Sequence, residues 1–339
     1  MAAVHVSTLA PRRRMAKASS VEDRLKDIAG LARSPDSPEV RAQLRKYLAS
    51  KVGLLVARAA DVVRQIDDHD FGPDLIAAFD RFMVDPVKTD KGCAAKIAVV
   101  KALLAAQCDE DGIFRIGIRH VQLEPTWGGR ADTAAPLRAL SALGLVQSGS
   151  PDAMNELAVL LADAETDARI GAAHALAHCG PAAAPLLRFK VLTGDAEPAV
   201  LAECLNGLMT LAPSASFGFV AGFVDARFPS LYEHAALAIS ESRLPEVFGL
   251  LKEKWSTNFS REFREALLLP IALTRSEEAC DFVISVLESG DARIATAAIA
   301  ALGIYRGDPA IRQRAETAIG GPNKPQLLEA LARAFDVRG

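Results

Sequence analysis

A nine-residue pattern of hydrophobic and small residues recurs along most of the chain at a nearly constant interval. Each copy is apolar at its first position and mostly apolar or small at its fifth, sixth, eighth and ninth positions, which places these residues on one broad face of a helix. The copies start 30 to 33 residues apart, at Leu137, Ile170, Val200, Leu231, Phe263, Ile294 and Leu327. The pattern therefore predicts seven similar helices, each one repeat further along the chain.

A second helical segment lies between successive copies of the pattern, as in residues 151–161, 181–190 and 277–287. Turn residues separate the segments, for example Gly180-Pro181, Gly194-Asp195 and Gly290-Asp291. Glycine after one helix and Ser, Asp or Pro before the next are typical helix ends. A repeat of about 31 residues then holds two helices that bury their apolar faces only against neighbouring repeats. The predicted fold is all-α: a right-handed α-solenoid of stacked helical hairpins.

The N-terminal third is also predicted to be helical, but its spacing is less regular. Weaker copies of the pattern start at Val40 and Ile97, and further helical stretches cover residues 53–66 and 74–84. Because the ends of a solenoid need atypical capping units, we expect this region to be a cap. We therefore expect a flexible basic tail in residues 1–20, a helical cap in 21–111 and regular repeats in 112–339.

The short period and the apolar windows from Leu137 onward resemble HEAT repeats, in particular the HEAT-like or phycobilisome-lyase-type repeats of about 30 residues. The resemblance is strong from residue 112 to the C-terminus. It implies an armadillo-like helical array and little about chemistry, because such repeats occur in scaffolds, adaptors, lyases and a few DNA-repair enzymes.

Composition and charge narrow the range of functions. Half of the residues are hydrophobic, which excludes a disordered chain. The net charge is −3, but residues 1–66 carry +7, so the remainder carries −10. An acidic body disfavours nucleic-acid binding, which depends on clustered Lys and Arg. The five cysteines never form a CxxC pair, and no apolar run reaches the length of a membrane span. We therefore expect a cytoplasmic protein without a membrane span.

The largest break in the period is the 40-residue interval between Ile97 and Leu137, and the extra residues fall in segment 119–138. This segment is predicted to be a long loop within one repeat. An exposed Trp beside Arg is typical of an interaction hot spot. The candidate partner-binding residues are Glu124, Trp127, Arg130, Asp132 and Arg138. In the alternative interpretation, Trp127 folds back to fill a gap between repeats while Arg130 pairs with Asp132.

His174 and His178 are the candidate metal ligands, since two histidines four residues apart project from the same side of a helix. Glu203 and Cys204, one repeat later, are the residues that could complete such a site. The HExxH motif is absent, and His178 falls on a nominal core position. We therefore expect no metal, no cofactor and no catalytic residues.

Three functions remain after these observations. We favour a non-enzymatic scaffold or adaptor that binds another protein, through a basic or amphipathic segment, on its concave face and on the 119–138 loop. The first alternative is an enzyme like the HEAT-repeat DNA glycosylases. The residues available to it beside damaged DNA are Trp127, Arg130, Asp132 and Arg138. The second is a bilin-lyase-like or chaperone function, which only the resemblance suggests. The sequence leaves the oligomeric state open.

Overall fold

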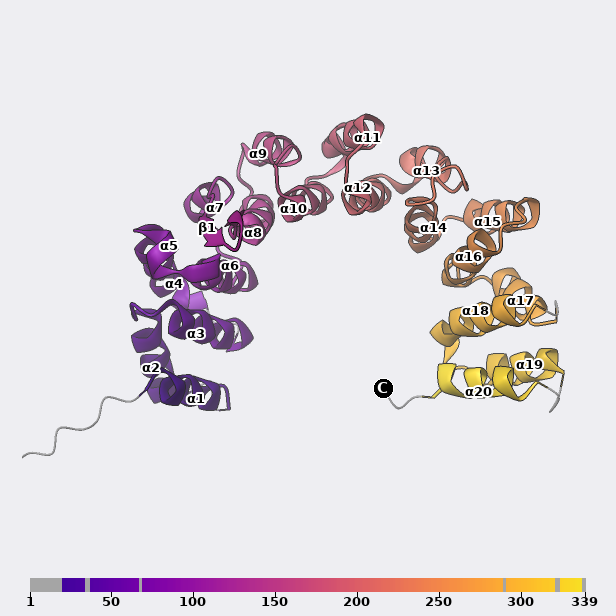
Figure 1. Ribbon diagram of the computed structural model, residues 1–339, viewed down its shortest axis with the longest axis horizontal. Coiled ribbons are helices and arrows are strands. Elements are labelled where there is room, and N and C mark those ends of the chain that lie inside the picture. Colours follow the sequence, from indigo (N-terminus) through magenta and orange to yellow (C-terminus); the bar gives the residue numbers. More distant parts are fainter. Residues whose placement is uncertain (1–19, 34–36, 67–68, 289–290, 321–323, 337–339) are drawn as a thin grey trace, which may run out of the picture. The chain divides into compact units, whose positions relative to one another are not determined.

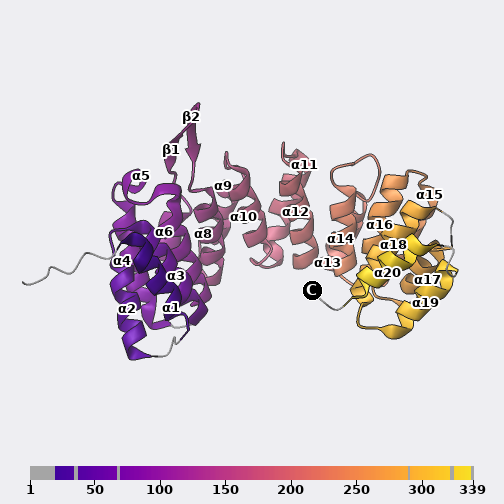
Figure 2. The ribbon, with the colours of Figure 1, turned by 60° about the horizontal axis from the view of Figure 1, so that its bottom comes forward.

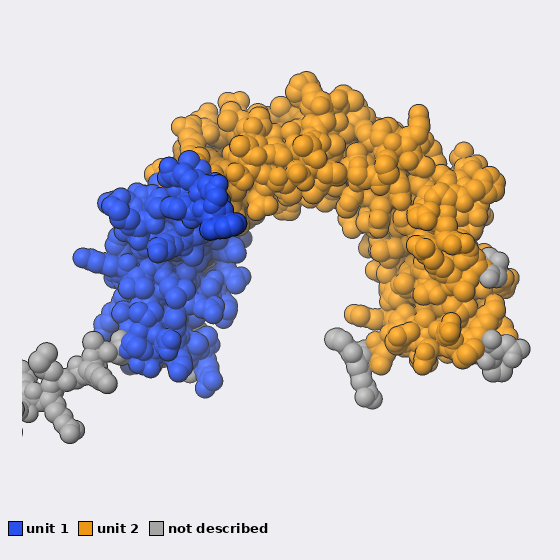
Figure 3. Space-filling model, viewed as in Figure 1, with its two compact units in different colours: residues 1–108, 122–131 blue, residues 109–121, 132–339 orange. Residues whose placement is uncertain are grey.

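The computed structural model describes residues 20–33, 37–66, 69–288, 291–320 and 324–336. Most of the residues of the expected basic tail therefore lie outside the described part of the chain. The chain divides into two compact units (Figure 3). Unit 1 comprises residues 1–108 and 122–131, and unit 2 comprises residues 109–121 and 132–339.

Unit 2 is built from helices joined by short turns (Figure 1). In chain order the helices are α7 (Asp111–Gly117), α8 (Ala135–Gln147), α9 (Ala153–Leu160), α10 (Thr166–Leu176), η3 (Pro181–Ala183), α11 (Ala184–Thr193), α12 (Pro198–Leu211), α13 (Pro213–Ala221), α14 (Tyr232–Glu241), α15 (Glu246–Thr257), α16 (Arg261–Leu273), α17 (Glu277–Val286), α18 (Ala292–Leu302), η4 (Gly303–Tyr305), α19 (Pro309–Ile319) and α20 (Pro325–Ala334).

The helices of unit 2 form two rows. Each even-numbered helix from α8 to α20 packs against the next even-numbered helix, and each pairs with the odd-numbered helix before it. The seven windows that share the apolar pattern fall on the seven even-numbered helices, which we call the even row. The predicted all-α architecture of stacked helical hairpins is therefore confirmed.

The even row is closely packed because small residues occupy its contacts. A Cβ atom on Gly171 of α10 would lie 2.5 Å from the Cα atom of Ala139 on α8, so only glycine permits this approach. The helix ends carry the expected polar caps. Ser276 accepts a hydrogen bond from the Ala279 N–H at the start of α17, and Asp291 and Asp308 cap α18 and α19 in the same way.

Asp195, in the turn after α11, is a nearly buried carboxylate that ties together residues from successive helices. It accepts hydrogen bonds from Arg169 Nε (2.9 Å), from Lys190 Nζ (2.8 Å) and from the backbone N–H of Glu197 (2.9 Å). Burial alone would raise the pKa of Asp195, but these donors outweigh it and hold the pKa well below its usual range.

We expect Asp195→Asn to lower the free energy of unfolding by about 2 kcal/mol at neutral pH, because hydrogen bonds to a charged group are lost. The pKa of Asp195 is lower in the folded state than in the unfolded state. The contribution of this carboxylate to the free energy of unfolding is therefore complete above the unfolded-state pKa of about 3.9 and disappears as the pH falls further. Urea unfolding should therefore show the same difference between the two proteins at pH 7 and pH 5, and a smaller one at pH 3. A difference that stays constant down to pH 3 would contradict this assignment.

Unit 1 contains α1 (Val21–Leu31), α2 (Pro38–Leu48), α3 (Gly53–Ile66), η1 (His69–Phe71), α4 (Gly72–Met83), α5 (Pro86–Thr89), η2 (Lys91–Cys93) and α6 (Ala94–Ala105). Helix α3 packs between α1 and α6, whereas α2 packs against α4. The two weak copies of the apolar pattern, at Val40 and Ile97, therefore lie on α2 and α6, which belong to different rows. Their spacing is not one period for this reason, and because α5 and η2 are inserted before α6.

A buried ion pair holds the insertion against α6. The carboxylate of Asp90 accepts hydrogen bonds from Lys96 Nζ (2.9 Å) and from the backbone N–H groups of Ala95 (2.7 Å) and Lys96 (3.1 Å). The side chains of Asp90 and Lys96 are 1% and 0% exposed. The carboxylate thus replaces a cap at the start of α6.

The expected long loop is instead a β-hairpin of two strands, β1 (Leu123–Thr126) and β2 (Gly129–Asp132). The turn is Trp127-Gly128, and Gly128 has a φ of +94°, a value that suits glycine. The prediction of an insertion within one repeat is right, since it lies between the paired helices α7 and α8. The expectation of a loop without secondary structure was wrong here, because a two-residue turn allows the backbone of the insertion to pair with itself.

Within the described ranges, no helix is both long and apolar enough to cross a lipid bilayer.

Candidate functional site

The hairpin presents Trp127 entirely to solvent. The relative exposure of Trp127 is 106%, and Leu123 on β1 is 42% exposed. Figure 2 shows the hairpin projecting beyond α5 and α6 of unit 1. The alternative interpretation, in which Trp127 fills a gap between repeats, is therefore wrong. Trp side chains are highly buried on average, so complete exposure is unusual in a folded protein.

Polar side chains in β1 and just before it hold the hairpin against the rest of unit 1. Gln122 is 1% exposed, and its Nε2 donates hydrogen bonds to the backbone oxygen of Asp90 (2.7 Å) and to Oε1 of Glu124 (2.6 Å). Glu124 Oε1 also accepts a hydrogen bond from the Gly92 N–H at 2.6 Å. Glu124 thus positions the hairpin.

The remaining predicted site residues fall into two separate arrangements. Arg130 is exposed and donates a hydrogen bond to the Leu123 backbone oxygen at 3.0 Å. Asp132 pairs with Arg138 and not with Arg130, at 2.7 Å. The Arg130–Asp132 pair of the alternative interpretation is therefore wrong.

Arg138 is the centre of a buried polar cluster in unit 2. Its guanidinium group also binds Asp163 at 2.9 Å and the His120 backbone oxygen at 2.9 Å. Burial lowers the pKa of Arg138, but the two carboxylates outweigh this effect and raise it. With side-chain exposures of 3% and 6%, Arg138 and Asp132 connect α8 to its neighbouring turns, and we assign both a structural role.

The histidine pair lies on the free face of the even row, which is the face that the odd-numbered helices do not cover. The ring centroids of His174 and His178 are 5.2 Å apart, and His174 Nδ1 lies 2.9 Å from Glu203 Oε1 on α12. His178 is exposed, so its placement in the core was wrong. Cys204 is buried, which raises the pKa of its thiol to about 12. Among the residues that the structure describes, no group of three or more His, Cys, Asp or Glu side chains could hold a metal ion.

A groove runs between α12 and α14 on the free face of the even row. It consists of two pockets of about 310 and 200 Å³ that share Asn206. We call it the α12–α14 groove and define it by its lining residues: Ile170, Ala199, Ala202, Glu203, Asn206 and His234 in the first pocket, and Asn206, Met209, Thr210, Ala238, Glu241 and Ser242 in the second. Its floor is mostly small or apolar, and each pocket contains one glutamate.

The charges around this groove have one sign. The three helices α10, α12 and α14 contain no Lys and a single Arg, Arg169, which is buried against Asp195. Their carboxylates are Asp167, Glu203, Glu233 and Glu241, of which all but Glu203 are exposed and Glu203 is half-buried. Arg243 follows α14 but does not line the groove. The groove therefore favours a positively charged ligand.

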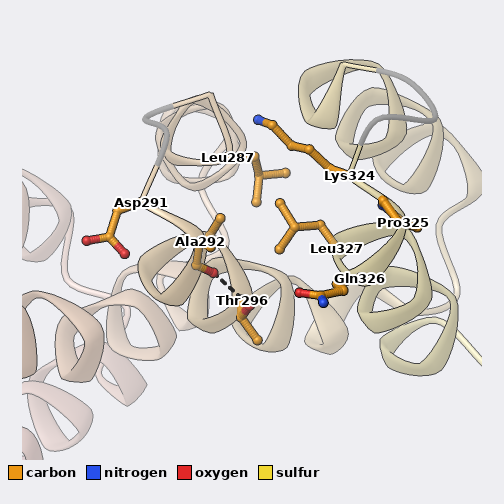
Figure 4. Close-up of a pocket in the computed structure, with 9 residues that line it drawn as sticks. Leu287, Asp291, Ala292, Thr296, Lys324, Pro325, Gln326 and Leu327 are labelled. Atoms are coloured by element: carbon orange, nitrogen blue, oxygen red, sulfur yellow. Dashed lines mark hydrogen bonds between the residues drawn. The ribbon is translucent and has the colours of Figure 1, made fainter.

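A further pocket of about 390 Å³ lies between α18 and α20 (Figure 4). Leu287, Ala295 and Leu327 form its apolar part, while Asp291 and Lys324 bring opposite charges to it. Asp291 already caps α18 and pairs with Arg261 at 3.2 Å. This carboxylate has a structural role, and the pocket lacks the single sign of charge that marks the α12–α14 groove.

Sequence reasoning missed two sets of residues. The first set holds the hairpin in place and comprises Asp90, Gly92 and Gln122. The available signal was an alternation in the sequence, in which polar Gln122 and Glu124 alternate with apolar Leu123 and Pro125. The second set lines the α12–α14 groove. The absence of Lys and Arg from three successive windows was the available signal, but the exposure of each residue depends on packing between repeats.

No protein-family model matches this chain, and no curated protein matches its sequence. Among solved structures, the complex of CpcE and CpcF of phycocyanin lyase from a Nostoc species is similar to it, with 16% sequence identity and a TM-score of 0.32. The match covers 96% of this chain and 99% of that one. A likeness of this size assigns neither a fold nor an activity to this chain.

Proposed function

We propose that this chain is a non-enzymatic scaffold that binds another protein, and that the α12–α14 groove takes a basic, amphipathic segment of that partner. The observation that carries the proposal is the combination of a mostly small or apolar floor with Glu203 and Glu241 and with no exposed Lys or Arg on the three helices around them. We also propose that the helix pairs are HEAT-like repeats. Since all five cysteines are free thiols, we place the scaffold in the reducing cytoplasm.

The dimensions of the groove suit side chains and not a whole folded domain. Pockets of about 310 and 200 Å³ accommodate a few side chains each, and the shared Asn206 makes them neighbours along α12. A helix that lays an apolar face into a groove, with charged residues at its edges, is a common mode of peptide recognition. Lys or Arg at the edges of such a segment would lie close to the two glutamates.

The same charges disfavour the DNA-processing alternative. Binding to a phosphate backbone requires Lys and Arg in the groove, and carboxylates there repel phosphates. The acidic lining supports a basic protein segment over a nucleic acid.

A labelled amphipathic peptide of about 14 residues, made of Leu, Ala and Lys, tests the charge of the groove. We expect Glu203→Gln/Glu241→Gln to weaken peptide binding about fivefold at low salt, since each exposed ion pair contributes modestly. The matched control is Glu277→Gln/Glu278→Gln, which changes the net charge equally at two exposed residues of α17. Fluorescence anisotropy measures the dissociation constants.

A steric pair of variants tests the location. Ala202→Trp fills the floor of the first pocket, whereas Ala300→Trp places the same side chain on an exposed site of α18. We expect only Ala202→Trp to weaken binding, by roughly tenfold or more, because the peptide loses its apolar contact. Circular dichroism should show that both variants are folded. Equal effects of the groove variants and their controls, or no binding by the wild-type protein, would overturn the proposal.

A further inference from the structure

Strand β1 carries its apolar side chains on the face that points away from the protein. Successive side chains of a strand point to opposite sides. Gln122 and Glu124 face the rest of unit 1 and form hydrogen bonds with it, so Leu123 and Pro125 share the opposite side, and Trp127 follows them in the turn. All three of these apolar side chains are exposed. In a strand with one solvated face, the polar residues normally occupy that face. The reversed order in β1 leaves an apolar surface exposed.

The hairpin is held in one conformation before any partner binds. Gln122 binds the backbone of Asp90 at 2.7 Å, the Gly92 N–H binds Glu124 at 2.6 Å, and Arg130 binds the Leu123 backbone oxygen at 3.0 Å. These contacts lie in unit 1. A prearranged hairpin loses little conformational entropy on binding, which is the condition under which a few side chains provide useful affinity.

The exposed charge of the hairpin is positive. Arg130 is exposed on β2, and Lys91 is exposed next to Gly92, which binds the hairpin. The carboxylate of Glu124 is half-buried and already accepts two hydrogen bonds. A surface that fits the hairpin therefore combines an apolar pocket with a carboxylate at its edge.

We propose that the β1–β2 hairpin is a second docking site, which inserts Trp127 into an apolar pocket of a partner protein while Arg130 binds an Asp or Glu at the edge of that pocket. Trp and Arg are the residues most enriched in interaction hot spots. An anionic membrane is the competing ligand for an exposed Trp with basic neighbours. The protein partner is favoured because the exposed apolar surface comprises only three side chains, two on β1 and one in the turn, which suits a pocket better than a lipid surface.

This site lies in unit 1 and shares no residue with the α12–α14 groove. An experiment that contradicts one of the two proposals therefore leaves the other intact. A benzoylphenylalanine in place of Leu123 leaves Trp127 intact and crosslinks whatever covers the apolar face. The full-length protein is irradiated in a lysate of its native host, and the crosslinked protein and peptide are identified by mass spectrometry. The identified protein is then purified, and its affinity for the wild-type chain is measured by calorimetry.

We expect Trp127→Ala to weaken this complex about 30-fold and Arg130→Ala to weaken it about tenfold, as for central hot-spot residues. The matched controls are Phe259→Ala, which removes an aromatic side chain that is 85% exposed in unit 2, and Arg33→Ala, which removes an exposed Arg of unit 1. Both controls should retain wild-type affinity within about twofold. All four variants should also unfold at nearly the wild-type temperature, because exposed substitutions change stability little.

Three outcomes would overturn the inference: no crosslinked protein, equal effects of the variants and controls, or a crosslinked site without an Asp or Glu near the bound Trp. Sedimentation with phosphatidylserine vesicles is the membrane arm. If Trp127→Ala abolishes vesicle binding and no protein crosslinks, the hairpin is a membrane contact and the protein-docking assignment is wrong.

Discussion

Leu208→Asp is expected to lower the free energy of unfolding of unit 2 by more than about 4 kcal/mol, because it buries a carboxylate without a partner. Leu208 is 0% exposed on α12, a helix that packs against α10, α11, α13 and α14. Since each repeat of a solenoid contacts only its neighbours, the damage should be greatest in these five helices. Urea unfolding followed by circular dichroism measures the loss, and amide hydrogen exchange shows where it occurs.

Thr210→Asp is the matched control for this prediction. Thr210 lies on the same helix, two residues further along, and is exposed on the free face of the even row. The same carboxylate placed there remains hydrated, so we expect a change of less than about 0.5 kcal/mol. If the two variants lose similar stability, the helix tolerates no charge anywhere, and burial of Leu208 would not be the cause.

Asp90→Ala should have the second large effect, a loss of about 3–5 kcal/mol in the stability of unit 1. The substitution leaves the ammonium group of Lys96 buried and without its carboxylate, and it removes the acceptor of the Ala95 and Lys96 backbone N–H groups. The remaining acceptor of Lys96 Nζ is the Phe82 backbone oxygen, at 3.4 Å. Thermal unfolding and urea titration both measure the loss.

The double variant Asp90→Ala/Lys96→Met separates the buried charge from the lost cap. Replacing the lysine by an apolar residue of similar length removes the uncompensated charge, so the double variant should be more stable than Asp90→Ala. Lys88→Ala is the surface control. Its partner Asp85 and Lys88 itself are 65% and 79% exposed, and the expected change is below about 1 kcal/mol. A double variant no more stable than the single one would show that the cap, and not the charge, accounts for the loss.

The helices were the most predictable part of the fold. The windows at Leu137 and Ile294 begin two residues into α8 and α18, and segment 277–287 differs from α17 by one residue. Apolar periodicity and helix-ending residues are local properties, so these boundaries follow from a few neighbouring residues. The row of a helix was less predictable: α2 and α6 carry similar patterns, yet α2 packs against α4 and α6 packs against α3.

The candidate site was predicted in position but not in detail. The break in the repeat period correctly placed an insertion between α7 and α8, and Trp127 is indeed exposed. The pairing of Arg138 with Asp132 and Asp163 was missed, since it joins residues 6 and 25 positions apart across turns. His178 was assigned to the core from its position in the window, but it lies just after the end of α10, where the helical face no longer applies.

The sequence by itself determined that this chain forms paired helices of similar length and that each pair depends on its neighbours, because a repeated apolar face follows directly from residue spacing. Only the tertiary structure decided which polar groups meet. Gln122 reaches the backbone of Asp90, and His174 reaches Glu203, across 32 and 29 residues. Contacts of this range depend on how the helices stack, and stacking is set by the summed packing of many side chains. The same packing left the apolar face of β1 and the acidic α12–α14 groove exposed.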